Sequence, residues 1–229
     1  MRKNILSVII FFGLAVSAVY AADFKVSIGL SGDFGPVFTS FDTNIPQPYK
    51  SEIERELKNI DATRSGFNFF LDLTYLEISL GGKYYFLEKK QDGPDLTETQ
   101  NFFNIGITGK FPFELLNNRI YFFPLLGLDF QFFTKFKDTV AGYSMEVTRS
   151  DLSDYNKDEA YFDRTVFNFG LGLDLLFTKN IFLRGVFVYG LNFHTKRQKE
   201  MIDEMKDIGY DIFVLNHGPS IKLALGYRF

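Results

Sequence analysis

The chain has 229 residues, a formal net charge of −3 at neutral pH and no cysteine. This length allows a single domain of moderate size. The mildly acidic balance argues against a nucleic-acid partner, and disulfides cannot hold a secreted form of the chain together. Phenylalanine is very abundant, with 29 copies, whereas tryptophan is absent.

The first 21 residues have the three-part pattern of a secretory signal peptide. Arg2 and Lys3 form a basic start, an apolar run covers residues 5–16, and a cleavage site follows Ala21. The apolar run is shorter than a membrane-spanning helix needs to be. We therefore expect residues 1–21 to be removed, and an uncleaved membrane anchor is the alternative.

Eight segments of the remaining chain alternate apolar and polar residues with period two, which is typical of β-strands with one apolar face. The stretches between them alternate in length, starting and ending with a long one. Pro124 removes a ladder donor from the fifth segment and predicts a bulge there. In chain order the segments cover residues 24–34, 66–73, 78–86, 103–111, 120–131, 164–175, 181–192 and 221–229.

Charged residues occur on only one face of these segments. A charge facing lipid at mid-bilayer costs about 2–4 kcal/mol, so a membrane barrel keeps its charges inside, whereas a soluble sheet turns its polar face outwards. The charged face carries Lys25, Asp33, Asp72, Lys83, Lys110, Asp129, Arg164, Asp174, Arg184, Lys222 and Arg228.

These patterns predict an all-β fold, an eight-stranded antiparallel up-and-down transmembrane β-barrel over residues 22–229. A barrel of this size is just filled by its inward side chains, and an unpaired buried charge would be costly. We therefore expect the charged residues to form a polar network that plugs the lumen. The even strand number and the loop lengths place both termini on the periplasmic side and four long loops outside.

The final strand ends on Tyr227 and Phe229, with no polar tail to cover its apolar face. Such an edge invites aggregation unless it pairs with the first strand and closes the barrel. A strand of this kind resembles the closing strand of bacterial outer-membrane barrels. The resemblance implies that the barrel-assembly machinery reads Tyr227 and Phe229 as an assembly signal.

The whole of residues 22–229 resembles the small eight-stranded barrels of the OmpA/OmpX, opacity-protein and OmpW-like group. The resemblance implies a multi-pass β-barrel in the bacterial outer membrane, in contact with its lipid. It does not imply one function, because this fold carries adhesins, channels, enzymes and anchors. Phrases that resemble spirochaete barrels of this kind are FLDLTYLEISLGGKYYF (70–86), FPLLGLDFQ (123–131), GLGLDLLF (170–177) and GPSIKLALGYRF (218–229).

Two of the long loops contain signals for short helices. Ser51 with Glu54 and Thr195 with Gln198 each have the spacing of a capping box, followed by apolar residues at helical spacing. Such helices can cap the barrel mouth or form a host-binding surface. The alternative is that they only pack the apolar residues of their own loops.

The third long loop is acidic, and we expect a solvated surface there, because its spacing does not match a Ca²⁺-binding loop. Its acidic residues are Asp151, Asp154, Asp158, Glu159 and Asp163. We predict no metal site and no cofactor.

His194 and His217 flank the fourth long loop and can approach each other at the outer rim. Barrel enzymes that act on outer-leaflet lipid combine a histidine with a serine and an acid. No serine and acid at a matching spacing complete such a set with His217, and Ser220, three residues on, falls on the opposite face of the strand. We therefore predict no catalytic residues.

These observations favour a non-enzymatic surface protein whose loops contact an extracellular ligand or serve the structure of the envelope. The alternative is a narrow passive channel for small solutes, porin-like or OmpW-like, because glycines and an excess of basic residues line the inner face. An enzyme acting on outer-leaflet lipid is a third hypothesis, and it rests only on the two histidines.

Overall fold

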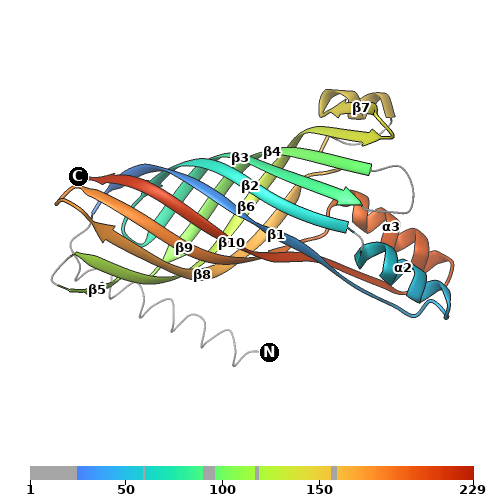
Figure 1. Cartoon of the computed structure of the whole chain (residues 1–229), viewed down its shortest axis with the longest axis horizontal. Coiled ribbons are helices and arrows are strands. Elements are labelled where there is room, and N and C mark those ends of the chain that lie inside the picture. Colours follow the sequence, from blue (N-terminus) through green and yellow to red (C-terminus); the bar gives the residue numbers. More distant parts are fainter. Residues whose placement is uncertain (1–24, 59, 90–95, 117–118, 156–158) are drawn as a thin grey trace, which may run out of the picture.

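The computed structural model describes residues 25–58, 60–89, 96–116, 119–155 and 159–229. It is a closed barrel of eight long antiparallel strands (Figure 1). Around the barrel the order is β4, β3, β2, β1, β10, β9, β8 and β6, and pairing of β4 with β6 closes the ring. The strands are β1 (Ser27–Thr43), β2 (Ile60–Asp72), β3 (Leu76–Lys89), β4 (Leu96–Lys110), β6 (Ile120–Val140), β8 (Arg164–Leu176), β9 (Ile181–Asn192) and β10 (Ile212–Arg228). The fold predicted from the sequence is confirmed, while the signal peptide over residues 1–21 lies outside the described residues.

Smaller elements lie at the two ends of the barrel. Figure 1 shows β7 and both helices at the end away from the C-terminus, and β5 near the opposite end. None of the helices within the described ranges is long and apolar enough to cross a membrane. These elements are α2 (Tyr49–Lys58), β5 (Phe113–Leu115), β7 (Tyr143–Thr148), the 3-10 helix η1 (Ser150–Tyr155) and α3 (Lys196–Asp207).

The closing strand lies where the sequence predicted it. β10 pairs with β1 from Ser27 opposite Arg228 to Thr43 opposite Ile212, and the amide of Phe229 donates to the carbonyl of Val26 at 2.9 Å. Since β10 also pairs with β9, both of its edges are hydrogen-bonded to neighbouring strands.

Several strands are longer than the alternation predicted. β1 continues to Thr43, β6 to Val140, and β10 starts at Ile212, so much of the expected loop region is strand. The prediction was too short because above the membrane both faces of a strand meet water. Apolar and polar residues then need not alternate, although the backbone pairing continues.

The bulge predicted at Pro124 was wrong. Pro124 lies opposite Leu171 in an unbroken register with β8, and its carbonyl accepts from the amide of Phe111, just beyond the end of β4. The donor that Pro124 lacks therefore falls next to the end of β4, where the paired stretch with β6 already ends. The irregularity in β6 lies higher, where its register with β4 shifts between Asn101 and Phe102.

The surface and the interior have the reverse polarity of a soluble protein. Large apolar side chains stand exposed around the barrel, for example Leu126 (59%), Phe187 (55%) and Leu223 (60%), whereas Arg184 is 1% exposed. A closed barrel satisfies every backbone group within the sheet and presents this apolar belt to lipid. The chain is therefore a barrel of the type that spans bacterial outer membranes.

Candidate functional site

Arg184 on β9 is the centre of an ion-paired cluster in the lumen. It lies opposite Ala224, in the half of the barrel nearer the C-terminus, which we call the lower half; the mouth at the loop end is the upper end. The guanidinium of Arg184 donates to both carboxylate oxygens of Asp174 (2.6 and 2.8 Å), to Asp72 (2.5 Å) and to Glu77. Lys110 pairs with Asp72, and further partners include Lys222, 3.3 Å from Glu77, and Arg228, 3.9 Å from Asp174. Arg side chains suit such sites because the planar fork serves several carboxylates at once.

Aromatic rings close the space around Arg184. The rings of Phe70, Phe123 and Phe182 lie 5.1–5.3 Å from its guanidinium carbon, within cation–π range. Glycines on the neighbouring strands make room for them, since a Cβ at Gly226 would come within 2.2 Å of Phe182. Ion pairs and aromatic rings therefore pack together around Arg184 at this level of the barrel.

A second set of pairs lies above this cluster. Lys83 pairs with Asp33 and Asn68 donates to Asp33, while Arg64 donates to Gly218 and Ser220 at 3.0 Å. The cavity between the two levels, which Asp129 also lines, has a volume of only about 40 Å³. A cavity of this size can hold only a few waters.

The structure brings together most of the inward residues that the alternation selected. Asp33, Asp72, Lys83, Lys110, Asp174, Arg184, Lys222 and Arg228 belong to the two ion-paired levels. Three members stand apart from these pairs: Lys25 lies 3.3 Å from the hydroxyl of Tyr121, Asp129 lines the small cavity, and Arg164 lies near the mouth.

Two buried charged residues were missed in the sequence. Glu77 was assigned to a turn and Arg64 to a loop, but both are 6% exposed and point into the lumen. Residues an even number of positions apart share one face of a strand. Glu77 lies two residues before Ser79 and Arg64 four before Asn68, and the alternation places both Ser79 and Asn68 on the inward face. Extending the period-two pattern beyond the apolar part of each strand would have found them.

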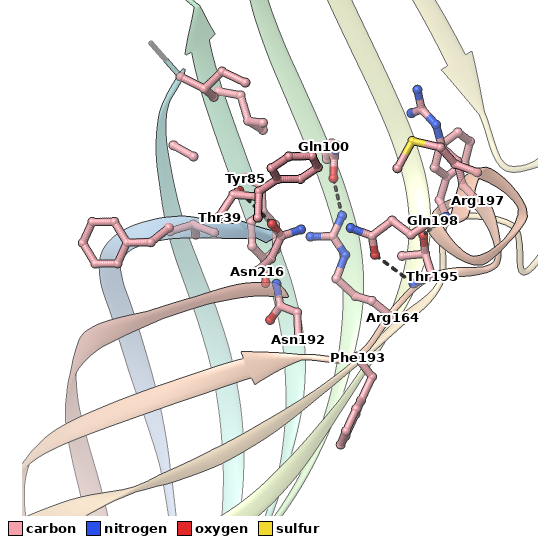
Figure 2. A pocket seen from close by; sticks show the side chains of 18 of the residues that line it. Thr39, Tyr85, Gln100, Arg164, Asn192, Phe193, Thr195, Arg197, Gln198 and Asn216 are labelled. Atoms are coloured by element: carbon pink, nitrogen blue, oxygen red, sulfur yellow. Dashed lines mark hydrogen bonds between the residues drawn. The ribbon is translucent and has the colours of Figure 1, made fainter. Parts of the chain in front are cut away.

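Above the plug the barrel opens into a mouth pocket of about 970 Å³. The upper ends of β1, β2, β3, β4 and β8 form its walls, and α3 lies over one side (Figures 1 and 2). A smaller vestibule of about 360 Å³ lies at the other end and includes Lys25, Tyr75 and Arg228. The ion-paired residues around Arg184 therefore lie between two open ends.

Arg164 forms the floor of the mouth pocket. Its guanidinium carbon lies 4.2 Å from the ring centre of Phe102 and 4.5 Å from that of Tyr85, and it donates to the side-chain oxygen of Gln100 (Figure 2). The Nε of Arg164 is shielded from solvent and has no hydrogen-bond partner. Tyr85 is itself fixed by its hydroxyl, which donates to Gln131 at 2.9 Å.

The helix over the mouth starts as predicted. The hydroxyl of Thr195 accepts from the amide of Gln198, and the Gln198 side chain accepts from the amide of Thr195, so this capping box is confirmed. Gly209 follows the helix with a φ of +90°, as expected for its end.

The capping box predicted at Ser51 was wrong. α2 already begins at Tyr49, and the hydroxyl of Ser51 donates to the carbonyl of Pro48 at 2.7 Å. Ser51 therefore lies inside the first turn. The helix starts earlier because the carbonyl of Pro48 already accepts the amide of Glu52.

The acidic third loop is partly structured by its own carboxylates. Asp163 accepts from Arg149 at 2.8 Å and from the amide of Phe133 at 2.7 Å. Asp151 accepts from the amide and hydroxyl of Thr148, which lowers the pKa of Asp151. The side chain of Asp154 and all of Asp158 lie outside what is described, and Glu159 lies 3.5 Å from Arg149. Within the described ranges no group of three or more His, Cys, Asp or Glu residues could hold a metal ion.

The two histidines at the rim are engaged separately. His194 contacts the carbonyl of Val214. His217 faces outwards and forms hydrogen bonds with the hydroxyls of Ser40, at 2.8 Å, and Tyr189. Ser40 could not be matched with His217 from the alternation alone, because the alternation did not show that β1 extends so far. In the described chain no carboxylate is hydrogen-bonded to His217.

No family model matches this sequence, and no curated protein sequence matches it significantly. Similar solved structures include Neisserial surface protein A (10% identity, 88% of this chain and 95% of that chain, TM-score 0.43). A second is the attachment invasion locus protein Ail of Yersinia pestis (12% identity, 90% of this chain and 99% of that chain, TM-score 0.35). A third is the N-terminal β-barrel domain of Pseudomonas aeruginosa OprF (12% identity, 90% of this chain and 100% of that chain, TM-score 0.38). The likeness concerns the barrel alone.

Proposed function

We propose that this outer-membrane barrel acts through the surface at its loop end, in adhesion or another interaction or in the structure of the envelope, and that its lumen does not conduct. The ion-paired plug around Arg184 carries this proposal. A barrel that closes its lumen with four hydrogen bonds from one arginine has only its two ends to offer to partners.

The two ends differ in size and construction. The loop end has both helices, the β7 hairpin and the 970 Å³ pocket, whereas the other end has tight turns such as the one closed by Thr178 and Ile181. An interaction surface is therefore expected at the loop end, which we place outside the cell. No catalytic residue, metal or cofactor is part of the proposal.

Loop-shortened variants test it. Residues 196–210, including α3, would be replaced by a short flexible turn between β9 and β10, and the β6–β7 hairpin would be shortened in a second variant. Both leave the barrel strands at membrane level intact, and heat-modifiable migration on gels reports folding. We expect at least one folded variant to lose binding to host cells or matrix, or to weaken the envelope. If every folded variant binds and protects like the parent, the proposal fails.

We also propose that residues 1–21 are removed during export and that Tyr227 and Phe229 are read by the assembly machinery. Both residues lie exposed on the outward face at the closing seam, where a machinery that holds the last strand can reach them. N-terminal sequencing of the membrane form tests the first statement. Deletion of Phe229 tests the second, and unchanged assembly of that variant would exclude it.

A narrow passive channel is the second candidate. Basic groups outnumber acidic ones in the lumen, and both ends are hollow. Only the segment around the 40 Å³ cavity would have to open. Conductance measurements separate this candidate from the first.

A further inference from the structure

Arg164 differs from Arg184 and from the lysines of the plug. Lys83, Lys110, Arg184 and Lys222 each lie within ion-pair distance of a carboxylate, whereas Arg164 has no such partner within the described part of the chain. Stacking on Phe102 and Tyr85 and a bond to Gln100 hold its guanidinium in place instead, and Glu98 acts on it only from beyond ion-pair distance. Its fork therefore retains donors at the floor of a large open pocket, and a carboxylate is the anion whose shape matches that fork.

The walls around Arg164 supply uncharged polar groups. Figure 2 shows Asn192, Asn216, Thr39 and Gln198 around the guanidinium, from β9, β10, β1 and α3. Asn192 is 6% exposed, and the oxygen of its amide is shielded without a partner. Carboxamides both donate and accept, which suits a ligand rich in hydroxyl groups.

The rim limits the charge of the ligand. Four carboxylates and one further cation line the pocket, so a polyanionic chain would meet mostly like charges there. They are Glu54, Asp61, Glu200 and Glu204, with Arg197 as the cation. The volume of about 970 Å³ is that of a small-molecule site. Phe162 and Met201 add apolar wall against which the carbon face of a ring can pack.

We propose that the mouth pocket binds one acidic sugar unit, a sugar ring with a single carboxylate, whose carboxylate pairs with Arg164 and whose hydroxyls bond to Asn192 and Asn216. The inference rests on the proposed function only in that the mouth faces outside the cell. Such a unit could come from the uronic acids of a polysaccharide or from the sialic acid at the end of a host glycan.

Isothermal titration of the refolded full barrel in detergent micelles tests this. The probes are glucuronate and N-acetylneuraminate, with glucose as the neutral sugar and acetate as the carboxylate without hydroxyls. We expect at least one acidic sugar to bind tenfold or more tightly than glucose and acetate, and the tighter of the two identifies the source. Equal affinity for glucose, equal affinity for acetate, or no binding by either acidic sugar would overturn the proposal.

Variants locate the site. Arg164→Gln should weaken binding at least tenfold, and Arg164→Lys should recover only part of it, because an ammonium cannot pair in the forked manner. Lys135→Gln, which removes a partly exposed pair with Glu146 outside the pocket, is the matched control and should bind like the parent. If Arg164→Gln does not fold, Asn216→Ala must weaken binding severalfold. Unchanged affinity in a folded pocket variant would refute the assignment.

The titration does not depend on a closed lumen or on cell binding. A failure here therefore leaves the proposed function standing, and a conducting lumen would leave the sugar site standing.

Discussion

Replacement of Arg184 by methionine should destabilise the barrel strongly. The change removes four hydrogen bonds to three carboxylates. The methionine side chain still fills most of the space that the carbon chain of Arg184 occupies. Asp72 keeps Lys110 and Glu77 keeps Lys222, but Asp174 is left with Arg228 at 3.9 Å. Breaking a buried pair on one side costs about 3–5 kcal/mol, and we expect the free energy of unfolding to fall by that amount.

Urea unfolding of the refolded barrel in lipid vesicles measures the free energy of unfolding. Circular dichroism reports the transition, since the chain has no tryptophan for fluorescence. Lys135→Gln is the control, and loss of its exposed pair should cost less than about 1 kcal/mol. In a double-mutant cycle with Glu77→Gln, the two changes should couple by about 1–3 kcal/mol.

A loss below about 1 kcal/mol for Arg184→Met, or no coupling to Glu77, would show that the cluster does not hold the lumen closed. The reasoning from ion pairs to plug would then be wrong.

Three further results are expected. Gly226→Ala drives a Cβ into a buried ring and should cost about 1–3 kcal/mol, whereas Gly185→Ala, whose Cβ would meet nothing within 4 Å, should be nearly neutral in the same unfolding assay. Hydrogen bonds from Thr148 lower the pKa of Asp151, so their contribution to the stability of the third loop is present above about pH 4 and is lost as the pH falls through the lowered pKa. Proteolysis of this loop should therefore rise only in acid, and Asp151→Asn should remove that dependence on pH. His217→Ala should leave the acylation of lipid A unchanged, since no carboxylate among the described residues is hydrogen-bonded to this histidine. A changed acylation pattern on mass spectra would revive the enzyme hypothesis.

The part of each strand that crosses the membrane could be predicted from the sequence. There lipid on one side and a packed interior on the other force every second residue to be apolar, so residues 181–192 were found with the bounds that β9 has. The closing strand was found for the same reason. Where both faces meet water this constraint ends, and the upper halves of β1 and β10 were taken for loops.

The site was predictable as a set of residues but not as an arrangement. Alternation placed Asp72, Asp174 and Arg184 inside the barrel, but only the register between distant strands shows that they meet. The same limit hid the contact of Ser40 with His217. Arg164 was selected as one inward charge among many, and its separation from every carboxylate pair could not be read from its position in the chain.

Single-channel recording of the refolded barrel in a planar bilayer tests the central claim, that the lumen is closed. Protein shown to be folded by heat-modifiable migration should give no reproducible current steps. Steps that recur and change size when Arg184 or Asp129 is replaced would contradict the claim, because they would show ions moving through the lumen past those side chains.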